Sequence, residues 1–272
     1  MWGETFAGYD VELMKVDKNQ TFEAFFENPI YLLYKNHLYN FLCRRRAIRQ
    51  RFDGNQSKQI LELGCGTSPM LEAAQGAIRT DFSWRALAFL KSHSRRGDKT
   101  RMAALDATRL PFTDHSLDCV ISSEMLEHIE RDDEVLKEIH RVLKPVGQLL
   151  LTCPVRPELF GFDDQFVGHY RRYDVDTLLH QLSEKGFGNF QVFSVLGPLE
   201  KQMMEKAIRV FSYFKKGEES SSGFRIRPLA WIFFPFYKVA NSLLACLVQF
   251  EARLIPLQKA VTVLIRCEKL AA

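Results

Sequence analysis

Short apolar runs alternate with amphipathic stretches from Lys58 to the end of the chain. Compact apolar runs bounded by turn residues predict strands, and apolar residues at every third or fourth position predict helices. The predicted strands are 59–63, 77–80, 101–104, 117–122, 148–152, 191–195 and 261–267, and the predicted helices are 69–75, 83–92, 132–143 and 175–185. This alternation is typical of a doubly wound α/β fold with a mostly parallel sheet. The last strand lacks a crossover helix, so we expect it to run antiparallel beside its predecessor.

Helical patterns lie on both sides of this alternating region. Residues 20–52 carry apolar and aromatic side chains at helical spacing, which predicts a helical cap over residues 1–56. Residues 57–272 then form one domain with two insertions, a lid segment at 155–173 and a helical insertion at 198–258 before the last strand. Lys215–Gly223 (KKGEESSSG) is expected to be a loop.

The stretch Pro228–Phe250 is the most apolar part of the insertion. A helix there would place several polar residues on one side, namely Lys238, Asn241, Ser242, Gln249 and Arg253. Pro235 is expected to disturb its first part. The polar stripe favours an amphipathic helix over a membrane span, and two alternatives remain: a helix packed in the core, or contact with a membrane surface through 228–256.

Composition narrows the class of protein. The chain has 272 residues, 46% of them hydrophobic and 26% charged, which is typical of a globular protein. A net charge of +4 is too small to indicate a nucleic-acid partner, and none is expected. The run Arg44–Arg46 with Arg49 and Arg51 is interpreted as a solvated helix face, with an anion-binding patch as the alternative.

The cysteines indicate the compartment and bear on metal binding. The six cysteines are dispersed, without C-x-x-C pairs or metal-ligand spacing, so we expect reduced thiols and no metal site. The first residues lack the pattern of a signal peptide. A cytoplasmic protein is therefore expected, with peripheral attachment to a membrane as an alternative.

Glycines and acids follow the first three strands. Gly64 and Gly66 permit a tight turn and the close approach of a ligand to the backbone. Asp81 ends the second strand, about 20 residues after Glu62, where an acid can accept both hydroxyls of a ribose. Asp106 follows the third strand and can accept a hydrogen bond from an adenine amino group. Alone each is also an ordinary turn or helix-start residue; together they predict an adenosine site.

These residues belong to a longer pattern, LELGCGTSP, LDATRLPF, SSEMLEHI and EIHRVLKPVGQLLLTCP. The pattern resembles class I S-adenosylmethionine (SAM)-dependent methyltransferases over residues 57–197, in particular the type 11 group that includes ubiquinone- and menaquinone-methylating enzymes. The resemblance implies a seven-stranded, Rossmann-like sheet with SAM over the first and fourth strands. The cofactor contacts that we then expect are Glu62, Gly64, Cys65, Gly66, Asp81, Phe82, Asp106, Ala107 and Ser123. The sequence departs from the family at Ser68 and Val146, where glycine is frequent.

Candidate catalytic residues lie past the fourth strand and in the lid. Glu124 and His128 are four residues apart and are expected to share a helix face, where either could act as a general base. The alternative is a structural His128 and a Glu124 that orients the cofactor. In the lid, His169 is a third candidate. Its neighbours Arg171, Arg172 and Tyr173 either contact an acceptor or only hold the loop through ion pairs.

We therefore expect an enzyme that transfers a methyl group from SAM to a small-molecule or lipid-like acceptor. A catalytically silent, SAM-binding assembly protein is the alternative. Pro69, three residues after Gly66, argues against a nicotinamide-dependent oxidoreductase, whose fingerprint has glycine there. The sequence shows no added RNA-binding module, so RNA methylation ranks low.

Overall fold

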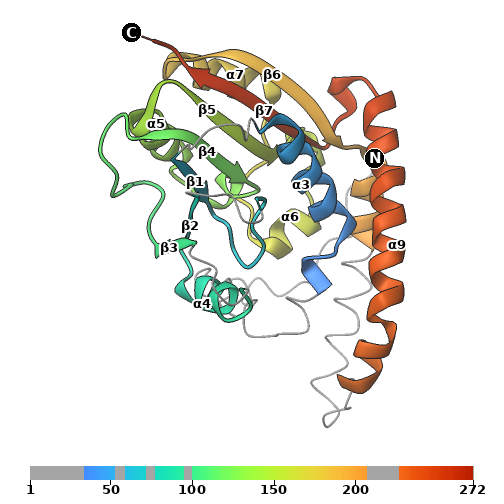
Figure 1. Ribbon diagram of the computed structural model, residues 1–272. Coiled ribbons are helices and arrows are strands. Elements are labelled where there is room, and N and C mark those ends of the chain that lie inside the picture. The colour runs from blue at the N-terminus through green and yellow to red at the C-terminus, as the bar shows by residue number, and fades with distance from the viewer. Residues whose placement is uncertain (1–33, 53–58, 72–76, 95–99, 207–226, 272) are drawn as a thin grey trace, which may run out of the picture.

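The computed structural model describes residues 34–52, 59–71, 77–94, 100–206 and 227–271 (Figure 1). Helical residues predicted at 20–33 and the loop predicted at 215–223 lie outside these ranges. The same holds for residues 72–75 of the helix predicted at 69–75, and its first residues, 69–71, are not helical.

A single seven-stranded sheet has the order β3-β2-β1-β4-β5-β7-β6. Its strands are β1 (Ile60–Leu63), β2 (Ala77–Asp81), β3 (Arg101–Ala104), β4 (Leu117–Ser123), β5 (Leu143–Pro154), β6 (Phe187–Leu196) and β7 (Thr262–Lys269). The first five strands run parallel, and β7 is antiparallel to both β5 and β6. The predicted doubly wound, mostly parallel fold with an antiparallel last strand is therefore confirmed. β5, β6 and β7 extend further than the sequence predicted.

Helices cover both faces of the sheet. They are α3 (Tyr39–Arg51), α4 (Trp84–Ser92), α5 (Asp132–Val142), α6 (Phe162–Val167), α7 (Val175–Glu184) and α9 (Arg227–Leu254), with short 3-10 turns η3 (Leu126–His128), η4 (Pro157–Leu159) and η5 (Leu257–Lys259). Leu61 and Leu63 of β1 pack with α5 and α7, whereas Ile60 packs with α3 and α9 on the other face. Successive side chains of a strand point to opposite faces of the sheet, so β1 contributes to an apolar layer on each face.

Two helix starts are where the sequence placed them. The side chain of Ser83 accepts a hydrogen bond from the backbone N–H of Ala86, and that of Asp174 accepts one from Thr177. Each satisfies a backbone donor that the first helical turn leaves without a partner. Gly186, at φ +86°, follows α7 in the left-handed conformation common after helix ends.

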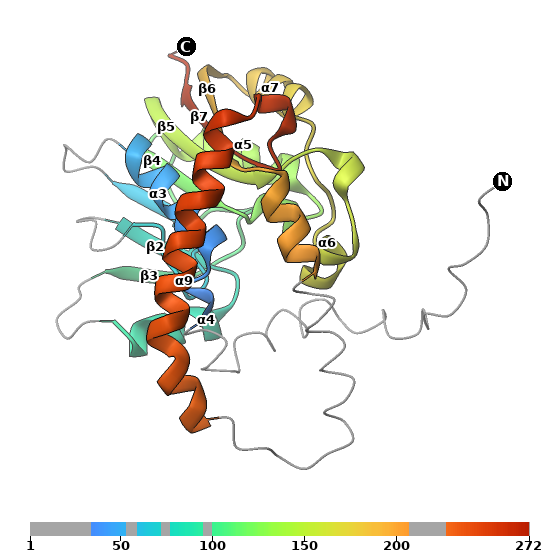
Figure 2. The same cartoon turned by 90° about the vertical axis from the view of Figure 1, so that its right-hand side faces the viewer.

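Helix α9 runs along the outside of the molecule beside α3 (Figure 2). Its buried positions are Asn241, Ala245, Val248 and Ala252, which recur at helical spacing. The helix continues through Pro235, so the proline does not end it. A proline costs an interior helix about 3 kcal/mol locally. The packing of the following turns against α3 holds the helix despite this cost.

Candidate functional site

The turn that contains Gly64 and Gly66, here called the glycine turn, lies where the order of the strands in the sheet reverses. β1 and β4 are neighbours, with Leu63 opposite Ser122, while the chain leaves β1 towards β2 and returns at β4. Gly64 and Gly66 have φ of +66° and +53°. A Cβ atom on Gly64 would lie 2.6 Å from Cγ of Met125, whereas one on Gly66 would meet no atom of the described residues within 4 Å. Both positions favour glycine because their φ is positive, and Gly66 also borders open space in which a ligand can approach the backbone.

Asp81 ties the glycine turn to the end of β2. Its Oδ2 accepts a hydrogen bond from the backbone N–H of Gly66 at 2.8 Å, and its Oδ1 accepts one from Ser83 at 2.9 Å. A carboxylate accepts hydrogen bonds from hydroxyl groups as well as from backbone N–H groups, so Asp81 is chemically suited to contact a ribose. The adjacent Phe82 is 63% exposed, which leaves an aromatic ring in solvent beside this carboxylate.

Glu62 lies beneath the turn. It is buried, and its Oε1 accepts a hydrogen bond from the backbone N–H of Met70. Burial raises the pKa of Glu62 to about 7, although Met70 and the nearby Arg79 favour the charged form. Cys65 is also buried, and burial raises the pKa of its thiol, so this side chain is a packing residue at neutral pH.

The segment before α3 reaches the same turn. The amide of Asn36 donates to the carbonyl of Thr67 at 3.5 Å and accepts a hydrogen bond from the hydroxyl of Ser68. Ser68, which stands where the family often has glycine, thus connects the turn to the N-terminal helical region. Sequence analysis did not single out Asn36, because no local pattern distinguishes it from other polar residues.

The β3 end adds Asp106 and Ala107. The backbone N–H of Leu105 donates to the carbonyl of Asp81 at 3.1 Å, which brings the residues after β3 beside the β2 end. Oδ1 of Asp106 accepts two hydrogen bonds from Thr108, the pattern of an Asx turn. Ala107 is buried at the edge of the main apolar cluster. The two predicted adenine contacts therefore lie next to the predicted ribose contact.

The β4 end differs from the prediction. Ser123 shares a 2.8 Å hydroxyl contact with Thr152 of β5. Glu124 follows at φ +50°, and only residues 126–128 form a 3-10 turn, so Glu124 and His128 do not share an α-helix face. A residue in the left-handed conformation cannot belong to a regular right-handed helix, so no α-helix includes Glu124. Glu124 Oε2 lies 3.5 Å from Nη1 of Arg44, so one arginine of the basic run faces this site.

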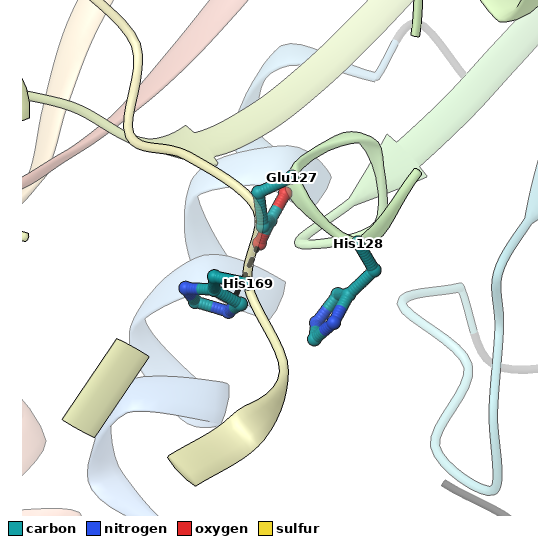
Figure 3. Close-up of side chains that lie close together, drawn as sticks. All are labelled: Glu127, His128 and His169. Carbon is teal, nitrogen blue, oxygen red and sulfur yellow. Dashed lines mark ion pairs between the residues drawn. The ribbon is translucent and has the colours of Figure 1, made fainter. Parts of the chain in front are cut away.

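Three side chains converge beyond Glu124 (Figure 3). Glu127 is fully buried, and Nε2 of His169 lies 3.8 Å from its Oε1, while the rings of His128 and His169 meet edge-on at 4.6 Å. Burial and then the neighbouring Glu124 raise the pKa of Glu127. Burial, His169 and a nearby lysine lower the pKa of His128 to about 3, so its ring is neutral. Sequence analysis did not select Glu127, since nothing local shows that it is buried.

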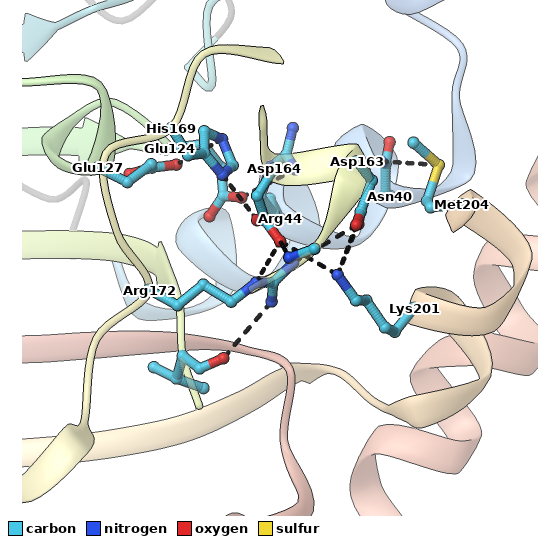
Figure 4. A network of polar contacts seen from close by, with 12 residues as sticks. Asn40, Arg44, Glu124, Glu127, Asp163, Asp164, His169, Arg172, Lys201 and Met204 are labelled. Atoms are coloured by element: carbon cyan, nitrogen blue, oxygen red, sulfur yellow. Dashed lines mark hydrogen bonds and ion pairs between the residues drawn. The ribbon is translucent and has the colours of Figure 1, made fainter. Parts of the chain in front are cut away.

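The lid is fixed by a network of charges (Figure 4). Asp164 accepts hydrogen bonds from Nδ1 of His169 at 2.9 Å and Nε of Arg172 at 2.8 Å. Lys201 donates to both carboxylate oxygens of Asp163, at 2.7 and 2.8 Å. Burial alone would raise the pKa of Asp164, but the hydrogen bonds from His169 and Arg172 hold this pKa well below its ordinary value. The interpretation that Arg172 holds the loop therefore agrees with the structure.

Arg171 and Tyr173 likewise have partners within the protein. Nη1 of Arg171 lies 2.8 Å from Oδ1 of Asp132, and the hydroxyl of Tyr173 donates to Oδ2 of the same carboxylate at 2.9 Å. Arg171 also donates to the carbonyl of Glu130. Both side chains thus connect the lid to the start of α5, and their role as substrate ligands stays a prediction.

Comparison with known proteins places part of the chain in a family. A family model described as a methyltransferase domain matches residues 61–151, from β1 into β5. Residues 61–151 of this chain therefore form a methyltransferase domain. The match includes the glycine turn, the β2 and β3 ends and the Glu124–His128 segment.

The methyltransferase domain has relatives in sequence and in structure. It is 33% identical over 111 residues to a demethylmenaquinone methyltransferase of Streptomyces griseus, which covers 39% of this chain and 47% of the relative. The chain thus spans about half the length of the curated relatives it matches. Its fold is similar to a methyltransferase solved in complex with the Haloferax volcanii Trm112 methyltransferase activator, with a TM-score of 0.60, 15% identity, and coverage of 92% and 98% of the two chains. It is also similar to Haemonchus contortus phosphoethanolamine N-methyltransferase 2 in complex with SAM, with a TM-score of 0.57, 18% identity, and coverage of 92% and 60%.

The structure brings the predicted cofactor residues of the methyltransferase domain to one edge of the sheet. These residues lie at or just after the carboxyl ends of β1 to β4: the glycine turn, Asp81, Phe82, Asp106, Ala107 and Ser123. Glu62 lies just beneath the turn. This is the edge at which doubly wound sheets bind ligands. The individual contacts to SAM stay predictions.

Proposed function

We propose that this chain transfers the methyl group of SAM to a small-molecule or lipid-like acceptor. The observation that carries the proposal is the bond from Asp81 to the backbone of Gly66 at the switch point of a matched methyltransferase domain. That bond places a carboxylate next to a backbone that a ligand can approach.

The residues present fit this cofactor. Gly66 borders open space, Asp81 can accept ribose hydroxyls, and Asp106 with Ala107 lies where an adenine would follow. The exposed ring of Phe82 offers an apolar surface to the same nucleoside. SAM supplies an activated methyl group on a sulfonium.

Methyl transfer from a sulfonium needs an acceptor atom in line with the methyl group. Holding the two reactants together can supply about 7–11 kcal/mol of the barrier. A hydroxyl or acidic-carbon acceptor must also lose a proton, and Glu124, His128 and His169 are the candidates beside the β4 end. The lowered pKa of His128 makes its ring a weak base at neutral pH.

Isothermal titration calorimetry with S-adenosylhomocysteine tests the proposal, with NAD as the control ligand. We expect saturable binding at one site per chain, none with NAD, and loss of binding in Asp81→Ala. An absence of binding in protein freed of copurified ligand would refute the assignment. Binding without turnover on any acceptor would favour the silent assembly protein.

A second observation favours a lipid-like acceptor. The face of α9 directed away from α3 carries large apolar side chains that are 54% to 72% exposed: Phe233, Phe236, Val239, Leu243, Leu247, Phe250 and Leu254. Residues Phe233–Leu254 have the length and hydropathy of a membrane span, and 17% of that window is buried. Because the opposite face packs on α3, we propose that α9 lies along a membrane surface instead of crossing the bilayer.

The surroundings of this apolar stripe suit an anionic lipid surface. Lys238 and Arg253 are exposed on one flank of α9, and Arg46 of α3 reaches Gln249 on the same flank at 3.1 Å. Cations beside a buried apolar stripe are typical of interfacial helices. We expect the protein to sediment with vesicles of phosphatidylcholine and phosphatidylglycerol.

The matched variants are Leu247→Asp in the stripe and Val146→Asp, an equally exposed apolar position in β5. Leu247→Asp should abolish sedimentation because it places a charge in the apolar layer, and Val146→Asp should leave it unchanged. If the intact protein stays in the supernatant with these vesicles, α9 is not a membrane-binding helix.

A further inference from the structure

Glu127, His128 and His169 each direct a ligand-type atom towards one point. One nitrogen or oxygen from each lies within 4.8 Å of the others (Figure 3). Glu127 and His128 come from the η3 turn, and His169 comes from the lid after α6. Groups that can bind a metal thus come together from two segments that are distant in sequence.

The hydrogen bonds of His169 fix which of its nitrogens is free. Nδ1 lies 2.9 Å from Oδ1 of Asp164, a carboxylate that also accepts from Arg172. A carboxylate can only accept, so the proton of the neutral ring is on Nδ1 and the lone pair is on Nε2. Nε2 faces Oε1 of Glu127 at 3.8 Å, which is too long for a hydrogen bond.

His128 is held in the same manner. A ring N–H of His128 donates to the main chain of Gly168, the residue before His169. Its other nitrogen therefore also has a lone pair. A histidine that binds a metal through one ring nitrogen usually donates the N–H of the other nitrogen to a carboxylate or a backbone carbonyl.

Glu127 completes the set. Its side chain has no solvent exposure, and in the described part of the chain neither carboxylate oxygen accepts a hydrogen bond from another residue. A buried carboxylate without hydrogen bonds is unfavourable unless a proton or a cation neutralises it. Two imidazole lone pairs beside it would repel its charge and attract a cation.

We propose that Glu127, His128 and His169 bind a divalent first-row transition metal of the zinc, iron or cobalt class. Two neutral imidazoles with one carboxylate are ligands that such ions prefer over magnesium or calcium. Asp164 and Gly168 are positioning residues, because they orient the two rings through the nitrogens opposite the metal. Three protein ligands leave a coordination position for a further oxygen ligand.

The site lies beside the glycine turn. Met125, two residues before Glu127, is the side chain that a Cβ on Gly64 would strike. If SAM binds as proposed above, and this step rests on that function, the open position suits a hydroxyl-bearing acceptor. Coordination acidifies the hydroxyl, its proton passes to Glu124, and its oxygen then bonds to the methyl carbon as the carbon–sulfur bond breaks, which leaves S-adenosylhomocysteine.

The test uses the full chain, stripped with a chelator and titrated with Co²⁺ while the visible d–d absorption is recorded. We expect saturation at one Co²⁺ per chain, displacement by Zn²⁺, and loss of stoichiometric binding in Glu127→Gln and His169→Gln. Asp164→Asn should weaken binding by about 10–100-fold. The controls are Glu184→Gln and His180→Gln, both exposed residues of α7, which should bind as the wild type does.

Unchanged binding in both ligand variants, or no stoichiometric Co²⁺ in the wild type, would overturn the site. If the variants do not fold, X-ray absorption of the Zn²⁺-loaded wild type decides: scattering from two imidazoles supports the site, and sulfur ligation refutes it. Calorimetry with S-adenosylhomocysteine on the metal-free protein separates the two proposals, because neither binding event requires the other.

Discussion

Replacing Gly64 and Gly66 by alanine, one at a time, separates packing from ligand approach in the glycine turn. Both residues have positive φ, which costs a non-glycine residue about 1–2 kcal/mol. A smaller unfolded-state entropy offsets about 0.4–1 kcal/mol of that cost. In Gly64→Ala the new Cβ would also lie 2.6 Å from Cγ and 2.9 Å from Cβ of Met125. Relief of such overpacking adds about 1–3 kcal/mol.

We therefore expect Gly64→Ala to lower the free energy of unfolding by about 2–4 kcal/mol, and Gly66→Ala by about 1 kcal/mol. For ligand binding we expect the opposite order, with Gly66→Ala the more damaging of the two changes. The Cβ of Gly66→Ala enters space that is open in the protein but would adjoin the cofactor, so its affinity for S-adenosylhomocysteine should fall by about tenfold or more.

Urea unfolding measures the stabilities, and calorimetry with S-adenosylhomocysteine measures the affinities. Equal m-values are needed, so that the change in midpoint reports stability alone. The reasoning is refuted if Gly66→Ala unfolds more readily than Gly64→Ala while it binds S-adenosylhomocysteine as tightly as the wild type.

Three further changes test separate parts of the fold. Burial raises the pKa of Glu200 to about 7, so the folded state binds more protons than the unfolded state between about pH 4.5 and 7, and stability falls as pH rises through that window. Glu200→Gln should therefore be more stable than the wild type by about 3 kcal/mol at pH 8 and equally stable at pH 4. A difference in urea unfolding that does not change with pH would contradict this. Val146, at φ +62° and exposed, should gain about 0.5–1 kcal/mol as Val146→Gly, seen as a higher Tm, and no gain would show that the turn is unstrained. Asp174→Ala should cost about 1 kcal/mol through loss of the N-cap of α7 in urea unfolding, whereas Asp176→Ala, which lacks that bond, should cost little.

The parts of the fold that depend on local pattern were predictable from sequence. Strand β1 and the turn at Gly64 follow from an apolar run that ends in glycine, and the caps at Ser83 and Asp174 follow from side-chain chemistry. These features need only neighbours along the chain, so the sequence contains their cause. The doubly wound sheet and its antiparallel last strand followed from the alternation of strands and helices together with the family resemblance.

The site was predictable only in part, since several of its features arise from contacts between distant segments. Glu127 is buried because the chain around Tyr170, whose N–H binds the Glu127 carbonyl, folds back over it. Glu124 adopts positive φ in the connection after β4, which a helical pattern does not reveal. Spacing alone therefore placed Glu124 and His128 on a helix that does not form, and gave no reason to expect a metal site.

The antiparallel strand β7 has a consequence for synthesis on the ribosome. It lies between β5 and β6, so β6 cannot join the sheet until residues 262–269 have emerged. While the insertion and α9 are being translated, the nascent chain presents an open edge on β5 and an apolar β6 without a neighbour. Such edges pair readily with other chains. We expect this interval to be the stage at which the nascent protein depends most on chaperones.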